Sequence, residues 1–289
     1  MNPGFPAWKA SGFEDWVRSR YSRKWADMIL LYVKHYGGLV ENGGDLSILA
    51  AFSRTKRNNV LKALIAFSKY LGRYEEFKHR VKNFGLKWEN QTSFESFLRI
   101  TRPDCDFLEW LKQVYSLRED LRVFTLFVMA TGLRTAEAIE AFNLIVKLSR
   151  EDRLREYYDP EKQVLEHFRY PKVFIRGTKN VFISFVPKDL VDRVAACKPV
   201  SYGMIRSLLR RRGLDMRFNG FRDRFATYTA THGLTMQEAD LLQGRVGKSV
   251  FMRHYFTPSI KELGERTLRI VEEMIRSTLK AVDQVREEA

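Results

Sequence analysis

Apolar side chains recur at helical spacing through most of the first 85 residues. Residues 12–36 carry large apolar side chains every three or four positions and stop at Gly37, which predicts one long helix. A short helix over 45–52 follows, a longer helix begins after the N-cap candidate Ser53, and a fourth helix covers 74–84. The N-terminal part of the chain is therefore predicted to be an all-helical domain.

A polar stretch then interrupts the helical pattern. Residues 88–103 are mostly polar and end in a proline, which favours a linker rather than a packed element. We therefore expect a domain over 1–90, a linker over 91–104 and a second domain over 105–289. Helical periodicity returns in the second domain over 107–117, 119–131, 136–148 and 263–285.

One segment of the second domain has a different pattern. Residues 172–176 and 181–186 are β-branched and aromatic runs, separated by the loop Gly177-Thr178-Lys179-Asn180. A loop with glycine and asparagine between two such runs is typical of a β-hairpin. The predicted fold class is therefore mainly α with a small β-hairpin or sheet (α+β).

The charge of the chain points to a polyanionic partner. There are 50 Lys and Arg against 35 Asp and Glu, a formal net charge of +15. A surplus of this size favours nucleic acid or an anionic membrane as a partner. No stretch approaches the ~20 apolar residues of a membrane-spanning helix, and the N-terminus lacks a secretory signal pattern. We therefore expect nucleic acid, not a membrane, as the partner.

Metal and redox chemistry have few candidate residues. Cys105 and Cys197 are far apart and form no CxxC pattern, and the five histidines show no HExxH spacing. We expect no metal, no cofactor and no disulfide, and a reducing, cytoplasmic location.

A basic segment opens the third N-terminal helix. It contains Arg54, Lys56 and Arg57 directly after Ser53. Free backbone N–H groups and the helix dipole favour anions at such a place, so these residues are candidate DNA contacts. A solvated helix cap is an equally good explanation of the same pattern.

Three separated segments carry the candidate chemistry. The first is Thr131-Gly-Leu-Arg134-Thr-Ala-Glu137, the second is Asn219-Gly-Phe-Arg222, and the third runs from Gln243-Gly-Arg245 to Tyr255. In this order, with a basic hairpin between the first two, they resemble the TGLRxxE, HxxR and LGH…Y motifs of tyrosine recombinases. The Gln-Gly-Arg form is similar to integrases of archaeal viruses and plasmids. The resemblance implies a helical core-binding domain followed by a tyrosine-recombinase catalytic domain.

The resemblance also implies roles for these residues. Tyr255 would attack a DNA phosphodiester and form a 3′-phosphotyrosyl bond, while Arg134, Arg222 and Arg245 hold the phosphate. Planar guanidinium groups match the charge that spreads over phosphate oxygens. Lys179 matches the family's mobile hairpin lysine, the general acid for the leaving 5′-oxygen; Lys172 is the alternative if the hairpin register differs.

Two positions depart from the family pattern. Asn219 and Arg245 stand where the two histidines are expected. Asparagine cannot take up a proton at useful pH, so a general base at this position is in doubt. His254 precedes the nucleophile but points about 100° away in a helix, which disfavours it as a substitute. Glu137 either orients Arg134 or is a carboxylate favoured by the helix dipole.

Assembly and reaction class leave alternatives. The helix over 263–285 has an apolar face, which suits docking on its own domain. The family resemblance instead implies that it reaches a neighbouring protomer and builds a tetramer on double-stranded DNA. A type IB topoisomerase-like nicking-closing enzyme would use the same residues. A non-catalytic DNA-binding protein on the same scaffold would have no physical need for them together.

Overall fold

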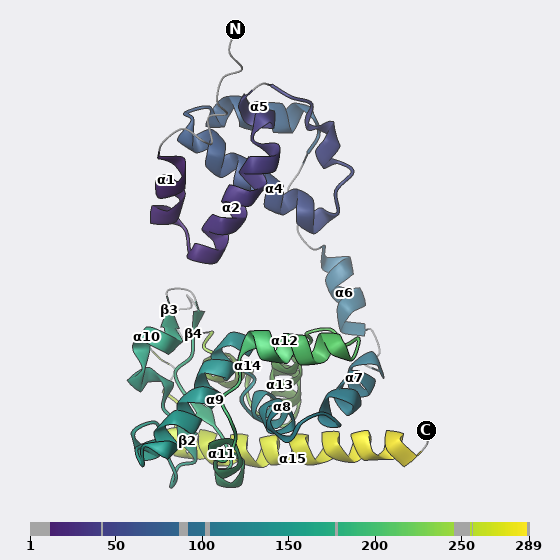
Figure 1. Ribbon diagram of the computed structural model, residues 1–289. Helices are drawn as coiled ribbons and strands as arrows, with labels where there is room; N and C mark the ends of the chain where they lie inside the picture. Colours follow the sequence, from purple (N-terminus) through teal and green to yellow (C-terminus); the bar gives the residue numbers. More distant parts are fainter. Residues whose placement is uncertain are drawn as a thin grey trace. The chain divides into compact units, whose positions relative to one another are not determined.

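A computed structural model describes residues 12–41, 43–86, 92–101, 105–176, 179–245, 255 and 257–287. The chain divides into two compact units, unit 1 over residues 1–102 and unit 2 over residues 103–289. Figure 1 shows the helices and strands of each unit. Each unit has a hydrophobic core of its own. The expected fold class, mainly α with a small β region, is confirmed.

The described residues of unit 1 form helices joined by turns, with no strand among them. Its core forms where α2 packs against α4, with Ile29 and Val33 facing Leu64 and Phe67. The single helix predicted over 12–36 is two helices, because Tyr21 and Ser22 are both extended. The elements are α1 (Phe13–Arg20), α2 (Arg23–Tyr36), α3 (Gly38–Glu41), η2 (Leu46–Leu49), α4 (Arg54–Tyr70), α5 (Tyr74–Asn83) and α6 (Ser93–Thr101).

The segment predicted as a linker contains helix α6. A reciprocal pair of hydrogen bonds starts this helix: the Thr92 N–H donates to Glu95 Oε2 at 2.9 Å, and the Glu95 N–H donates to Thr92 Oγ1 at 3.1 Å. A Thr-x-x-Glu capping box of this kind satisfies amide groups that a helix start leaves unpaired. The polar composition of the stretch thus includes a helix start signal.

Unit 2 is built around the central helix α8 (Glu119–Thr131). From Asp120 to Thr131 every residue except Arg122 is buried, as expected for a helix that is apolar on all sides. Helices on both sides of the sequence surround it: α7 (Cys105–Tyr115), α9 (Thr135–Arg150), α11 (Lys188–Ala195), α13 (Gly220–Thr231) and α15 (Ile260–Glu287). The remaining helices are α10 (Pro171–Phe174), α12 (Tyr202–Arg211), α14 (Met236–Leu242) and the short η3 (Leu154–Glu156) and η4 (His167–Arg169).

The predicted hairpin is partly wrong. Residues 171–174 form helix α10, which begins at Pro171, a favoured first helical residue. Only β3 (Ile175–Arg176) and β4 (Lys179–Asn180) pair as a hairpin. The run over 181–186 instead supplies β5 (Ser184–Phe185) to an antiparallel sheet with β2 (Val164–Leu165) and β1 (Tyr158–Asp159).

A buried polar network lies beside this sheet. His167 Nδ1 is 2.6 Å from the Tyr157 hydroxyl, and His167 Nε2 is 2.9 Å from the Ser184 hydroxyl. All three side chains are buried. Burial lowers the pKa of His167 from 6.5 to about 3, so the imidazole is neutral at physiological pH. The buried network therefore holds His167 as the neutral ring.

Helix α15 packs on its own unit. It lies along α7 and α8 (Figure 1) and buries Leu263, Val271, Met274 and Val282 in the core of unit 2. This is the arrangement that its apolar face favours, and an exchange between protomers would have to undo it. Although α15 is 28 residues long, no helix in the described part of the chain is long and apolar enough to cross a membrane.

Candidate functional site

Arg222 lies at the centre of the candidate site. It is in the first turn of α13 and only 6% exposed. Its Nη1 donates to the Gly132 carbonyl at 3.1 Å, and its Nη2 donates to the Gln243 carbonyl at 2.6 Å. One guanidinium group thus joins the end of α8 to the turn after α14, two segments far apart in the sequence.

Gly132 brings the first motif to this point. It ends α8 in a left-handed conformation, with φ +58°, and an added Cβ would lie 2.5 Å from the ring of Phe225. Only glycine allows both this backbone conformation and the close packing of α8 on α13. The tight turn places Arg134 directly before α9.

Glu137 holds Arg134 in place. The Arg134 backbone N–H donates to Glu137 Oε2 at 3.2 Å, and Arg134 Nη1 donates to Glu137 Oε1 at 2.7 Å. Glu137 is 1% exposed, whereas the Arg134 side chain is partly open to solvent. Both explanations from the sequence therefore describe real contacts, since the carboxylate caps α9 and pairs with Arg134.

The third arginine joins the same region. Arg245 follows Gly244 after α14, is half exposed, and lies 3.6 Å from Asp240. Burial, followed by the positive charges of Arg134 and Arg245, lowers the pKa of Arg222 from 12.5 to about 10. Arg222 remains protonated at neutral pH. The structure thus brings three cationic side chains from three separate segments into one region. An anion bound there would reduce the repulsion between their positive charges.

The side chain of Asn219 makes hydrogen bonds with a residue of the first motif. Its Oδ1 accepts from Thr135 Oγ1 at 3.0 Å and from the Thr135 N–H at 3.4 Å. Thr135 is the residue after Arg134. The contact therefore ties the start of α13 to the start of α9, and both helices carry candidate arginines.

The β3–β4 hairpin reaches the same turn. A Cβ added to Gly244 would lie 1.6 Å from the Asn180 carbonyl oxygen, so the two backbones are in direct contact. Lys179 precedes Asn180 in β4 and pairs with Arg176, while its side chain lies outside the described residues. Lys172 is exposed in α10, so it is a helical residue and not part of the hairpin.

Tyr255 has the exposure that a nucleophile requires. It is 70% exposed, whereas Tyr157 is fully buried and its pKa is raised by burial. His254 lies outside the described residues, as does the segment over 246–254. A position of Tyr255 beside the three arginines stays a prediction.

The basic residues of unit 1 have identifiable neighbours. Arg54 pairs with Glu95 through contacts of 2.6 and 2.8 Å. The Lys56 ammonium lies 3.9 Å from the centre of the Phe52 ring, and Arg57 donates to the Ala50 carbonyl at 3.4 Å. Their predicted role in DNA binding remains untested.

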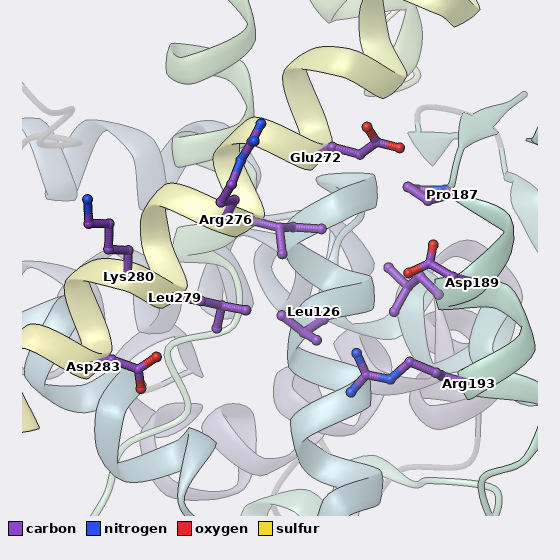
Figure 2. A pocket seen from close by; sticks show the side chains of 11 residues that line it. Leu126, Pro187, Asp189, Arg193, Glu272, Arg276, Leu279, Lys280 and Asp283 are labelled. Carbon is purple, nitrogen blue, oxygen red and sulfur yellow. The ribbon is translucent and has the colours of Figure 1, made fainter.

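A second candidate region is a groove beside α15 (Figure 2). It has a volume of about 880 Å³ and an apolar floor that includes Leu126 and Leu279. Its rim combines three acidic and three basic side chains, so it does not select for anions. These are Asp189, Glu272, Asp283, Arg193, Arg276 and Lys280. No cluster of metal-ligating side chains occurs among the described residues.

The sequence did not reveal two residues of the site. Gln243 and Gly244 were noted only as neighbours of Arg245, yet one bonds to Arg222 and the other contacts the hairpin. The glycine between two polar residues was the available signal for a close backbone approach. Nothing in the sequence pattern indicates that the amide of Gln243 is buried.

Clustered guanidinium groups on a basic, mainly helical chain are typical of proteins that bind phosphodiesters. The family model described as archaeal phage integrase matches residues 102–262, more than half of the chain, and the protein belongs to this family. The match includes all three arginines and Tyr255. Comparisons with curated proteins and with solved structures gave no significant match. Membership in the family supports a general role in DNA integration or recombination.

Proposed function

We propose that this integrase is a tyrosine recombinase that cleaves and rejoins double-stranded DNA. The observation that carries the proposal is the link that the buried Arg222 makes to the carbonyls of Gly132 and Gln243. Each of these residues stands two positions before a further arginine, Arg134 or Arg245. Three guanidinium groups of this kind can stabilise the negative charge that develops on the oxygens of an attacked phosphate. The cluster supplies this stabilisation from side chains of the chain itself.

The proposed reaction has two reversible steps. The phenol oxygen of Tyr255 attacks the phosphorus, forms a 3′-phosphotyrosyl bond and breaks the bond to the 5′-oxygen. Lys179 donates a proton to that leaving oxygen, as a flexible ammonium group on a short hairpin can. A 5′-hydroxyl from a partner strand then attacks the phosphorus of the phosphotyrosyl bond, returns its proton to Lys179 and releases Tyr255. The contact between Asn180 and Gly244 supports a place for Lys179 near the arginines.

No histidine of the described site serves as the base in this scheme. The side-chain oxygen of Asn219 accepts a hydrogen bond from Thr135, and an amide cannot take up a proton at useful pH. Activation of Tyr255 as a nucleophile then depends on the surrounding positive charge. The reaction is thus proposed to depend on the positive charge of the arginine side chains and not on a histidine base.

The decisive experiment is the trapping of a covalent adduct. The protein is incubated with a nicked suicide duplex in excess EDTA and then resolved by denaturing electrophoresis. Wild type is expected to form the adduct, and Tyr255→Phe is not. The matched control is Tyr202→Phe, because Tyr202 is also exposed and also belongs to unit 2. An adduct that persists in Tyr255→Phe would overturn the assignment.

The same cleavage chemistry allows two outcomes, which are strand exchange between two duplexes and the nicking and closing of one duplex. A tetramer assembled through the C-terminal segment would exchange strands between two duplexes. The packing of α15 on its own unit favours an alternative, a monomeric nicking-closing enzyme similar to type IB topoisomerases. Relaxation of a supercoiled plasmid without joint products between two labelled duplexes would support this alternative. Joint products, together with a tetramer on DNA in light scattering, would support recombination.

A further inference from the structure

Gln243 is a buried polar residue for which the proposed reaction has no use. It follows α14, and its side chain is 0% exposed. Its Nε2 donates to the backbone carbonyl of Arg222 at 2.7 Å, while Arg222 Nη2 donates to the backbone carbonyl of Gln243 at 2.6 Å. The two residues are thus joined by a reciprocal pair of hydrogen bonds across 21 positions of the sequence.

Chemistry fixes the orientation of this amide. The carbonyl of Arg222 can only accept, so the nitrogen of the Gln243 amide must face it. Oε1 is then turned away, and it is buried without a hydrogen-bond partner among the described residues. An unpaired buried acceptor costs free energy, so a methionine of similar length would be the better residue for packing alone. The amide is therefore not explained by core packing.

The two reciprocal hydrogen bonds hold the backbone in two places, at Arg222 and at Gln243. The bond to the Arg222 carbonyl holds the first turn of α13, from which the guanidinium extends. The return bond holds the peptide of Gln243, and Arg245 is two residues further along the chain. The same guanidinium holds Gly132, two residues before Arg134. The spacing of all three arginines thus depends on where Gln243 holds Arg222.

We propose that Gln243 is a positioning residue that keeps the Arg222 guanidinium in register with Arg134 and Arg245 around the scissile phosphate. The inference rests on the proposed strand cleavage. Gln243 acts through Arg222 and does not contact DNA. Its loss should therefore slow cleavage without weakening the binding of the duplex.

The test uses Gln243→Met, which keeps the length of the side chain and removes both polar atoms. The matched control is Gln237→Met, because Gln237 is an exposed residue of α14, the helix that Gln243 directly follows. For Gln243→Met we expect the rate of single-turnover adduct formation to fall about 10- to 100-fold, as for other misplacements of a catalytic group. Its Kd for the duplex and its Tm should stay close to those of wild type. Gln237→Met should match wild type in all three measurements.

A double-mutant cycle separates positioning from general stability. If Gln243 acts through Arg222, the effects of Gln243→Met and Arg222→Lys on the cleavage rate should be strongly non-additive. Additive effects would overturn the inference. So would a wild-type rate in Gln243→Met, or a fall in rate that parallels a fall in Tm.

A measurement without DNA distinguishes this inference from the proposed function. A wild-type protein that forms no adduct would contradict strand cleavage itself. In that case, the hydrogen bonds between Gln243 and Arg222 can still be followed through the ¹⁵N resonances of the Arg222 side chain. Slow exchange of the Nη2 protons in wild type and fast exchange in Gln243→Met would support it, and equal exchange in both would refute it.

Discussion

The backbone of Gly244 lies directly against the carbonyl of Asn180. A Cβ built on Gly244 would be 1.6 Å from the Asn180 oxygen and 3.1 Å from the Cα of Val181. The turn that leads to Arg245 and the hairpin that carries Lys179 therefore have a fixed separation, and a side chain at position 244 would change it.

Gly244→Ala should accordingly separate the hairpin from the arginine turn. The methyl group cannot be accommodated, because the neighbour is backbone and not the end of a flexible side chain. We expect adduct formation on the suicide duplex to fall at least about 10-fold, since small displacements of reacting groups are costly. Overpacking of this kind should also reduce stability by about 1–3 kcal/mol beyond the cost of backbone strain.

Gly213→Ala is the control for that strain. Gly213 has φ +69° and Gly244 has φ +68°, but no atom lies within 4 Å of a Cβ added at Gly213. The two variants therefore share the penalty of a left-handed alanine, about 1–2 kcal/mol, and differ in the clash alone. Equal losses of activity and Tm in both would show that the contact with Asn180 has no functional consequence.

Glu137→Gln tests the support of Arg134. The amide keeps the size of the side chain but removes the negative charge that holds the Arg134 guanidinium at 2.7 Å. We expect the rate of adduct formation to fall about 10-fold or more, because Arg134 loses its fixed orientation. DNA affinity should not weaken, since a negative charge next to the arginines has been removed. Single-turnover rates and fluorescence anisotropy measure the two quantities separately.

The control is Glu140→Gln. Glu140 is exposed on α9, one turn after Glu137, so its loss changes the net charge equally without touching Arg134. If both variants slow cleavage to the same extent, the effect is one of overall charge, and Glu137 has no special role.

The long helices α7, α8, α9 and α15 of unit 2 were predictable because each has its own local signal. The apolar run over 119–131 predicts a helix, and α8 has these bounds. The break between α1 and α2 was not predictable, because the apolar period continues across Tyr21 and Ser22. A small β region was predicted, but its strand pairing was not, for a similar reason. Strands of two residues are too short to show alternation, and the partner of β5 is β2, about 20 residues earlier in the chain.

The sequence motifs name candidate residues of the site but not the contacts between them. The motifs single out Arg134, Arg222 and Arg245, and their role in a phosphate site stays a prediction. The motifs do not show that the guanidinium of Arg222 is bonded to two carbonyls, or that Gln243 is bonded back to it. Such contacts depend on how α8, α13 and α14 pack, and packing is not a property of any one segment.

His167 should make the stability of unit 2 sensitive to acid. Its pKa is about 3 in the folded protein against 6.5 for the free side chain, because burial disfavours the charged ring. Between these pH values the unfolded chain binds a proton that the folded chain does not. Stability should therefore be unaffected above pH 6.5 and fall below it, by up to about 1.4 kcal/mol per pH unit. Calorimetric unfolding at a series of pH values measures the slope.

His167→Gln identifies the source of this slope. Glutamine can still bond to a hydroxyl group but does not titrate, so the variant should be less stable at pH 7 and lose less stability between pH 6.5 and 5. His35→Gln serves as the control because His35 is exposed on α2, outside unit 2. An unchanged slope in His167→Gln would assign the acid sensitivity to other groups.

The role of unit 1 in DNA binding can be tested at Lys56. This exposed lysine is in the first turn of α4, where the Ser53 side chain makes no capping bond, and its ammonium lies above the ring of Phe52. Arg54, by contrast, is already paired with Glu95. If Lys56 contacts a phosphate, Lys56→Gln should reduce the slope of log K against log salt by about 0.9.

Lys62→Gln is the matched control, because Lys62 is exposed further along the same helix. Both substitutions lower the net charge by one, so any effect of overall charge on long-range attraction is common to both. A counterion is released only where a phosphate is contacted, and only Lys56→Gln should then change the slope. Equal slopes in the two variants and in wild type would place the DNA contacts of unit 1 elsewhere than at the start of α4.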